Sequence, residues 1–393
     1  MSVLPMVRAI ARSPATRMVV LLALILVASP PFSEKLGPAA ANFMITVTNA
    51  GLSRLDAAAL ERGYYEDLTR VDRFNGQLWE VYAKRPADWL DVRANSLSRL
   101  TGDFRLRELA PSSVARTSFS VISTNSFGMR DQEYAKIPLP GTFRVGLLGA
   151  SMEMGWGVED DETFESVLER RLNDAALVAP FERLEILNFA VAGATPLQQM
   201  ATLERALTFD LDVVLYMEHP REFGRSIDHL ARIRRQDIDI PYPYLRDVMV
   251  EADVAPGASR TVAERRLAPF ADEVLLWAYQ RIATLARDAG AVPVWLSGPR
   301  LEPFGTTGDE EGPPAVELAK QAGFEVLRLD GAFEGHDQSE IAIAEWDRHP
   351  NALGHQLIAE RLYDLLSDRH GILPLPAAPQ DEHLVVQDDD LGT

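Results

Sequence analysis

The stretch that decides the fold is FRVGLLGASMEMGWG, residues 143–157, in which an apolar run ends at a glycine and a serine. Its first part predicts a buried β-strand over 143–149, because the run is short, apolar and followed by turn-forming glycines. A helical pattern then begins near Thr163. A strand followed by a helix is the first half of a βαβ unit, and this order places Ser151 at the carboxyl end of the strand.

The same alternation continues along the rest of the chain. Apolar runs predict further strands at 185–190, 212–217, 292–297 and 325–329, and helical patterns predict helices near 162–177, 196–208, 267–289, 313–322 and 352–367. Short apolar strands that alternate with helices are typical of a parallel sheet covered by helices on both faces. The sequence therefore predicts an α/β fold with a mostly parallel, five-stranded sheet.

Segments outside this alternation divide the remainder of the chain. Residues 34–120 are predicted to form a mainly helical extension, although Ser, Thr, Val and Phe in 104–126 indicate short extended pieces. The α/β domain is expected to span residues 121–372 and to contain a charged, proline-containing insertion at 219–266. The acidic tail, 373–393, has the composition of a disordered segment.

Charge and composition exclude several classes of protein. The chain of 393 residues carries 58 acidic and 39 basic residues, a formal net charge of −19. This balance argues against binding to nucleic acid or to an anionic membrane surface, since both need clustered positive charge. The absence of cysteine excludes disulfides, thiolate metal sites and a cysteine nucleophile. The seven histidines show no ligand spacing such as His-Glu-x-x-His, so we expect no metal and no other cofactor.

The amino-terminal segment indicates export. Arg8, Arg12 and Arg17 precede an apolar run over residues 18–28, and two prolines follow it. The run is shorter than the ~20 residues that span a bilayer, so residues 1–33 are more typical of a secretory signal than of a membrane span. An uncleaved anchor through the apolar run is the alternative. We expect the protein to be periplasmic, or anchored to the inner membrane and facing the periplasm.

A histidine and a carboxylate near the other end of the chain complement the serine. The segment Asp347-Arg348-His349-Pro350-Asn351 precedes the last helical pattern. We expect Asp347 and His349 on one irregular loop, because a proline disfavours helical conformation in the residue before it. The carboxylate could then bond Nδ1 of His349 and leave Nε2 facing Ser151, which gives a nucleophile, a base and an orienting group. Taken separately, each is at least as well explained in another way, Ser151 as a polar turn residue, Asp347 as a loop or capping carboxylate and His349 as a surface histidine.

Three blocks of sequence resemble those of the SGNH (GDSL-type) hydrolase superfamily. They are Gly149-Ala150-Ser151 with the following Gly155-Trp156-Gly157, then Asn188-Phe189-Ala190-Val191-Ala192-Gly193, and finally Asp347-Arg348-His349-Pro350-Asn351. Their order also matches, as do their positions after the first strand, after the second strand and before the last helix. The resemblance covers roughly residues 120–367, and it implies a flavodoxin-like three-layer sandwich.

The resemblance also implies a role for each matching residue. Ser151 would be the nucleophile, His349 the general base and then acid, and Asp347 the group that orients the histidine. The backbone N–H of Gly193 would join that of Ser151 in an oxyanion hole. We expect Asn188 to support the neighbouring turn through hydrogen bonds rather than to touch substrate. Such a site cleaves an ester through an acyl-enzyme.

The sequence departs from the family in two supporting positions. The serine block of the family usually reads Gly-Asp-Ser, whereas Ala150 stands in this chain. The third block should offer an asparagine as an oxyanion donor, but the third strand continues into Glu218-His219-Pro220-Arg221-Glu222. His219 or Arg221 are the candidates to replace that donor. Loss of one such donor costs on the order of 2.7–4 kcal/mol of transition-state stabilisation.

Together these features predict an exported serine esterase that acts on acyl esters. The resemblance and the predicted export suggest O-acyl groups of carbohydrate or cell-envelope polymers as substrates, so the expected partner is a small-molecule or polysaccharide acyl ester. Transfer of the acyl group to a sugar hydroxyl, as in exopolysaccharide modification, is the first alternative. The second is an envelope binding or assembly protein in which Ala150 and the missing asparagine have weakened catalysis.

Overall fold

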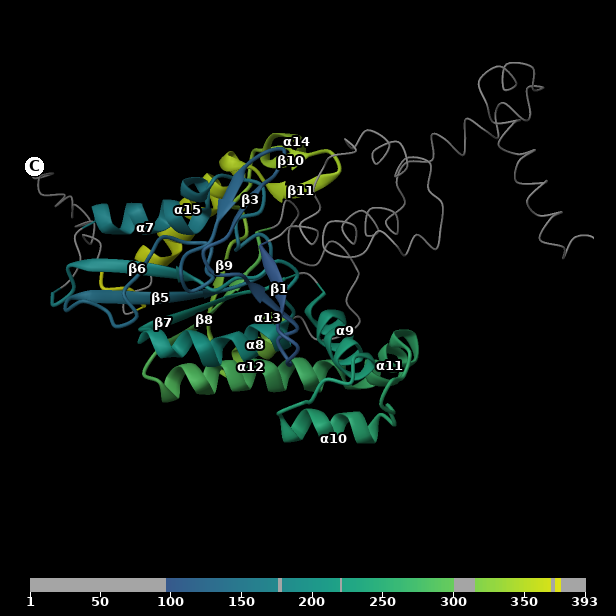
Figure 1. Ribbon diagram of the computed structural model, residues 1–393. Coiled ribbons are helices and arrows are strands. Elements are labelled where there is room, and N and C mark those ends of the chain that lie inside the picture. Colours follow the sequence, from purple (N-terminus) through teal and green to yellow (C-terminus); the bar gives the residue numbers. More distant parts are fainter. Residues whose placement is uncertain (1–96, 176–178, 220, 300–314, 369–371, 376–393) are drawn as a thin grey trace, which may run out of the picture. The chain divides into compact units, whose positions relative to one another are not determined.

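The computed structural model describes residues 97–175, 179–219, 221–299, 315–368 and 372–375 (Figure 1). The predicted signal or anchor, most of the predicted helical extension and most of the acidic tail lie outside these ranges. None of the helices formed by the described residues combines the length and the apolar character needed to cross a membrane.

Five parallel strands form the central sheet, in the spatial order β6-β5-β7-β8-β9. Their bounds are β5 (Thr142–Leu148), β6 (Arg183–Asn188), β7 (Val213–Met217), β8 (Val292–Ser297) and β9 (Glu325–Arg328). The five strands expected from the sequence are therefore confirmed, within two residues at each end. This is the strand order of flavodoxin-like sheets, in which the second strand is added on one side of the first and the third strand on its other side. Here the strand order reverses between β5 and β7, where such folds bind ligands at the carboxyl ends of the strands.

Helices cover both faces of this sheet (Figure 1). One face carries α7 (Phe164–Asp174) and α15 (Ala352–Asp368), and the other carries α8 (Pro196–Ala206), α12 (Ala271–Asp288) and α13 (Ala315–Ala322). Side chains along β7 alternate between the two layers: Val213 and Leu215 pack with α7 and α15, whereas Tyr216 packs with α8 and α12. This alternation follows from the two-residue period of a strand. The fold is the expected three-layer α/β sandwich.

The two helices that follow β5 and β6 begin at side-chain caps. Thr163 precedes α7, and its hydroxyl accepts the N–H of Ser166 at 3.1 Å. Thr195 precedes α8, and its hydroxyl accepts the N–H of Gln198, while the Gln198 side chain accepts the N–H of Thr195. Pro196 suits the first helical position, where no N–H is needed. These caps fix where each strand-to-helix connection ends.

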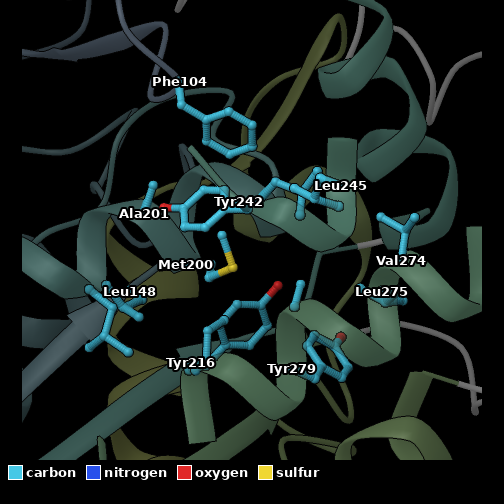
Figure 2. Packing of buried hydrophobic residues seen from close by; sticks show 14 of the residues in the cluster. Phe104, Leu148, Met200, Ala201, Tyr216, Tyr242, Leu245, Val274, Leu275 and Tyr279 are labelled. Carbon is cyan, nitrogen blue, oxygen red and sulfur yellow. The ribbon is translucent and has the colours of Figure 1, made fainter. Parts of the chain in front are cut away.

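Aromatic side chains fill the layer between the sheet and α8, α12 and the segments beyond. Figure 2 shows Met200 between Tyr216 of the sheet and Tyr242, with Phe104 beyond them. Tyr216 and Tyr279 meet edge to face with ring centroids 5.3 Å apart. Aromatic burial of this kind supplies much of a core's apolar area. The contact between Tyr216 and Tyr279 joins the carboxyl end of β7 to α12.

The segment predicted as an insertion is largely helical. It forms α9 (Glu222–Arg235), α10 (Pro243–Glu251) and α11 (Arg260–Leu267) (Figure 1). α9 packs against both α11 and α12, and Tyr244 of α10 stacks on Trp277 of α12. Short elements complete the described chain: the 3-10 turns η2 (Asp160–Glu162), η3 (Leu207–Phe209) and η4 (Ala268–Phe270), and α14 (Gln338–Ile341).

The helical expectation for residues 34–120 is wrong over residues 97–103, the described part in which no extended pieces were expected. Residues 97–123 contain two antiparallel strand pairs, β1 (Ser98–Leu100) with β2 (Arg107–Leu109), and β3 (Val114–Arg116) with β4 (Val121–Ser123). A turn interrupts the helical pattern, because Gly102 adopts a positive φ and the Asp103 carboxylate accepts the N–H of Arg105. The short extended pieces expected over 104–126 are present.

Candidate active site

Ser151 lies in a tight turn at the carboxyl end of β5. Backbone hydrogen bonds close this turn, from the N–H of Met154 to the carbonyl of Ala150 at 3.0 Å and from the N–H of Trp156 to the carbonyl of Ser151 at 2.9 Å. The serine is only 5% exposed. The turn therefore presents the hydroxyl at the edge of the sheet where the strand order reverses, in a position largely shielded from water.

Asp347 and His349 lie on β11 (Asp347–Pro350), which pairs with β10 (Ala342–Ala344) in a short antiparallel hairpin. The expectation of an irregular loop is therefore corrected. Alternate residues of a strand share a face, which brings the two side chains together. The Asp347 carboxylate lies 2.5 Å from Nδ1 of His349 and also accepts the backbone N–H of His349 at 3.2 Å. The carboxylate thus fixes both the ring and the backbone of the histidine.

His349 reaches the serine with its other ring nitrogen. Nε2 lies 2.8 Å from Oγ of Ser151, within hydrogen-bonding distance, and the histidine is 1% exposed. An ionised carboxylate can only accept hydrogen bonds, so Nδ1 carries the proton that faces Asp347. In the neutral imidazole, Nε2 is then the acceptor for the Ser151 hydroxyl. This is the arrangement that allows a histidine to remove the proton from an attacking serine.

The surroundings of Asp347 favour its charged form. Burial by itself would raise the pKa of this carboxyl. The charge of His349 and the hydrogen bonds from its ring and backbone outweigh burial, with a smaller contribution from the Trp156 indole, so the pKa lies below its ordinary value. Asp347 is therefore ionised at neutral pH and can stabilise positive charge on His349.

Gly193 lies in a turn just after β6. The N–H of Ala194 donates to the carbonyl of Val191, and the positive φ of Gly193, +74°, suits a glycine. The N–H of Val191 donates to the carbonyl of Gly149 at 3.3 Å, which ties this turn to the turn that carries Ser151. Over the described ranges, neither Gly193 nor Ser151 uses its backbone N–H in a hydrogen bond. Both groups are thus available to an oxyanion, although that role stays a prediction.

Asn188 supports this turn, as expected. Its side-chain oxygen accepts the N–H of Ala190 at 3.1 Å, and its amide donates to the carbonyl of Glu153 at 2.7 Å. The residue is completely buried. Asn188 therefore joins the loop after β6 to the turn that carries the serine, and it lies within the protein rather than on a substrate-facing surface.

The loop after β7 holds the two candidates for the third oxyanion donor. His219 is buried, and its backbone N–H donates to the carboxylate of Glu222 at 2.9 Å. Arg221 is half-buried and precedes α9 in a left-handed conformation. Burial raises the pKa of Glu222 to about 8, although hydrogen bonds from Tyr279, Tyr216 and His219 oppose the rise. A buried glutamate thus anchors this loop, and donation by His219 or Arg221 to an oxyanion stays a prediction.

Arg130 is a supporting residue that the sequence did not reveal. The side chain is buried, and it donates to the carbonyls of Met154 at 3.1 Å and Val158 at 2.6 Å, and also to that of Gly155. Its Nε bonds the carboxylate of Asp160 at 3.0 Å. The guanidinium therefore holds the loop that follows Ser151. Three of its four acceptors are backbone carbonyls, which leave no signal in the sequence.

His355 has a packing role rather than a place in the catalytic arrangement. It lies on α15, where its ring stacks on Phe164 at a centroid distance of 5.9 Å. Nδ1 accepts the N–H of Phe164 at 3.1 Å. Burial, helped by the charges of Arg130 and His349, lowers the pKa of His355 to about 3, so this ring is neutral at physiological pH. Among the described residues, no group of three histidine or carboxylate side chains is arranged to hold a metal ion.

Comparisons with known proteins give only weak similarities. Neither a family model nor a curated protein matches the sequence. Matching solved structures include an α/β hydrolase from the metagenome of Lake Arreo, with 16% identity, a TM-score of 0.36, and coverage of 57% of this chain and 94% of that one. An acetyl xylan esterase from Geobacillus stearothermophilus matches with 14% identity and a TM-score of 0.36, and the match covers 59% of this chain and 97% of that one. A G-D-S-L family lipolytic protein from Desulfitobacterium hafniense matches with 13% identity and a TM-score of 0.33, and the match covers 56% of this chain and 98% of that one. Function is therefore inferred from the geometry of the site.

Proposed function

We propose that this chain is a serine esterase that cleaves acyl esters through an acyl-enzyme on Ser151. The observation that carries the proposal is the continuous contact from Ser151 Oγ through His349, at 2.8 Å, to the Asp347 carboxylate, at 2.5 Å. A neutral hydroxyl is a poor nucleophile, and a histidine held in this way is the usual means of activating it.

The proposed reaction has two stages. In the first, Ser151 Oγ attacks the acyl carbonyl while His349 Nε2 takes the hydroxyl proton, and the ionised Asp347 stabilises the resulting imidazolium. The N–H groups of Ser151 and Gly193 receive the oxyanion, and His349 returns the proton to the departing alkoxide. In the second stage, water attacks the acyl-enzyme, His349 again takes and returns the proton, and a carboxylic acid leaves the restored serine.

The substrate and the location of the enzyme are part of the proposal. The basic and apolar amino-terminal segment, residues 1–33, supports export to the periplasm, either free or held by an uncleaved anchor at 18–28. An exported esterase of this kind meets O-acylated carbohydrate in the cell envelope. The net charge of −19 favours neutral or cationic acyl esters over polyanions.

Acyl transfer is the second candidate, because both reactions share the acyl-enzyme on Ser151 and differ only in the group that attacks it. A sugar hydroxyl bound beside the acyl-enzyme would replace water as the attacking group, with the same proton transfers through His349. The outcome would then be an ester on the acceptor rather than a free acid.

The test compares the wild-type protein with Ser151→Ala on p-nitrophenyl acetate and on acetylated glycans. We expect the wild type to release p-nitrophenol and the variant to lose this activity. Addition of unacetylated oligosaccharide separates the two candidates, because transfer yields an acetylated sugar and hydrolysis yields acetate alone. Equal turnover by the two proteins would contradict the proposal, and absence of turnover by both would favour the envelope binding or assembly protein.

A further inference from the structure

Glu153 lies against the backbone of the nucleophile turn. Its Oε2 accepts the backbone N–H of Ala150 at 2.5 Å, and the residue is 3% exposed. Ala150 is the residue directly before the serine, and it brings no carboxylate of its own to the site. Burying an ionisable carboxyl group beside this backbone costs folding free energy unless the surroundings stabilise it.

The surroundings are shaped to hold Glu153 in this position. A Cβ added to Gly149 would lie 2.1 Å from Cγ of Glu153, so the glutamate occupies the space that a side chain at position 149 would need. The amide of Asn188 donates to the backbone carbonyl of Glu153 at 2.7 Å. The side chain of Glu153 is therefore held by Gly149 and Ala150, and its backbone carbonyl is held by Asn188.

Two groups on other elements act electrostatically on this carboxylate. The positive charge of Arg225 on α9, and that of His349 on β11 when its imidazole is protonated, favour the ionised form. Burial is the larger effect and raises the pKa of Glu153 to about 7, while the N–H of Ala150 lowers it. The carboxylate thus titrates near neutral pH, and it interacts with the same imidazole that receives the proton of Ser151.

We propose that Glu153 is a positioning residue of this site, which holds the peptide before Ser151 and adds a second negative charge near His349. Fixing the N–H of Ala150 orients the next peptide, whose N–H belongs to Ser151 and is one of the two proposed oxyanion donors. The negative charge complements Asp347 in stabilising the imidazolium that forms during attack. This role rests on the proposed esterase mechanism and extends it.

The test measures how fast a fluorophosphonate labels Ser151, together with kcat and KM for p-nitrophenyl acetate. Glu153→Gln keeps the size and an acceptor oxygen but removes the charge. We expect it to label about tenfold more slowly than the wild type, with a reduced kcat and an unchanged KM. Labelling by the wild type should also slow as the pH falls through about 7, as Glu153 takes up a proton. The Gln variant should lose the part of this decline that protonation of Glu153 contributes and keep any part that comes from the base itself.

Two further variants keep the test decisive. Glu169→Gln is the matched control, because Glu169 is another buried glutamate whose carboxylate accepts a backbone N–H, that of Ile186 at 2.6 Å, away from the serine. It should label at the wild-type rate. Glu153→Asp keeps the charge but draws it back from Ala150, so it should also label slowly, and it carries the test if the Gln variant does not fold.

The outcomes separate this inference from the esterase mechanism. Wild-type labelling rates in a folded Glu153→Gln or in Glu153→Asp, with Ser151→Ala unlabelled, would overturn the role of Glu153 alone. Labelling of Ser151→Ala at the wild-type rate, or absence of labelling in the wild type, would instead overturn the serine mechanism on which that role rests.

Discussion

Nε2 of His349 lies 2.8 Å from Oγ of Ser151, although the two residues are 198 positions apart in the chain. The contact depends on how closely the loop after the serine approaches the β10–β11 hairpin. Gly157 in that loop has a φ of +109°, and a Cβ there would lie 2.6 Å from Cγ2 of Ile343 and 3.1 Å from the carbonyl oxygen of Pro350. The absence of a side chain at Gly157 therefore permits the close approach of this loop to the hairpin that carries His349.

Replacement of Gly157 by Ala should separate the two catalytic elements. The added methyl group meets the hairpin and forces either the loop or β11 to move, so we expect a loss of kcat beyond any loss of stability. Gly257→Ala is the matched control, since Gly257 also has a positive φ, +70°, but nothing lies within 4 Å of its added Cβ. Both changes strain the backbone by about 1–3 kcal/mol. Esterase assays measure kcat, and urea unfolding measures the stability of the two variants. Equal kcat values for Gly157→Ala and Gly257→Ala would show that the approach of this loop to the hairpin does not matter for activity.

Replacement of Asp347 by Asn should remove most of the activity without unfolding the hairpin. The amide no longer fixes the proton on Nδ1 and no longer stabilises the imidazolium, and the equivalent change in serine proteases lowers kcat by about 10⁴-fold. We expect a fall of similar order in kcat for p-nitrophenyl acetate. The exposed Asp161 provides the control, because Asp161→Asn should retain wild-type kcat. A kcat for Asp347→Asn within a factor of about three of the wild type would be inconsistent with the triad.

Replacement of Arg130 by Lys should loosen the loop that follows the serine. A single ammonium group cannot reach the carbonyls of Met154, Gly155 and Val158 together with the Asp160 carboxylate, as the forked guanidinium does. We expect a loss of roughly 3 kcal/mol in the free energy of unfolding, since the buried acceptors lose their donors. Urea unfolding measures this loss, and fluorophosphonate labelling shows whether Ser151 loses reactivity as well. A variant as stable and as reactive as the wild type would mean that Arg130 does not act as a clamp.

Replacement of Glu222 by Gln should make stability less dependent on pH. Burial raises the pKa of Glu222 from 4.5 to about 8, so the folded protein binds this proton more tightly than the unfolded chain does. The stability it contributes is fully present below pH 4.5 and is lost as the pH rises through about 8. Relative to the variant, the wild type should lose about 1.4 kcal/mol of unfolding free energy for each pH unit within this window.

Urea unfolding at several pH values between about 5 and 9 measures that difference. His229 and His355, whose pKa values burial lowers to about 3, are present in both proteins, so their effect on stability cancels. The exposed Glu251 supplies the control, because Glu251→Gln should follow the wild-type curve. A constant difference between wild type and Glu222→Gln across this range would show that the carboxyl does not titrate in it.

The sequence predicts the sheet well because each parallel strand is a short apolar run bounded by turn residues, as in 143–149. It also identifies Ser151, Asp347 and His349 as candidates, since their residue types and order carry the chemistry. Residues 97–103 were expected to be helical as part of the extension 34–120, whereas short extended pieces were expected from residue 104 onward. The strand pairs there depend on turns and on long-range packing, which spacing alone does not reveal.

Glu153 and Arg130 could not be identified from the sequence for a common physical reason. Their partners are mainly backbone groups, the N–H of Ala150 and the carbonyls after the serine, which every residue possesses. Only the folded turn brings these groups within reach. The carboxylate that is missing at position 150 is visible in the sequence, whereas the carboxylate that approaches the same peptide from position 153 is visible only in the structure.

Mass-spectrometric mapping of fluorophosphonate labelling on the folded protein tests the activation of Ser151 by His349 most directly. We expect one modified peptide, labelled on Ser151, with labelling abolished in Ser151→Ala and strongly slowed in His349→Ala. Modification at another residue, or equal labelling of the wild type and His349→Ala, would contradict the claim that His349 activates Ser151.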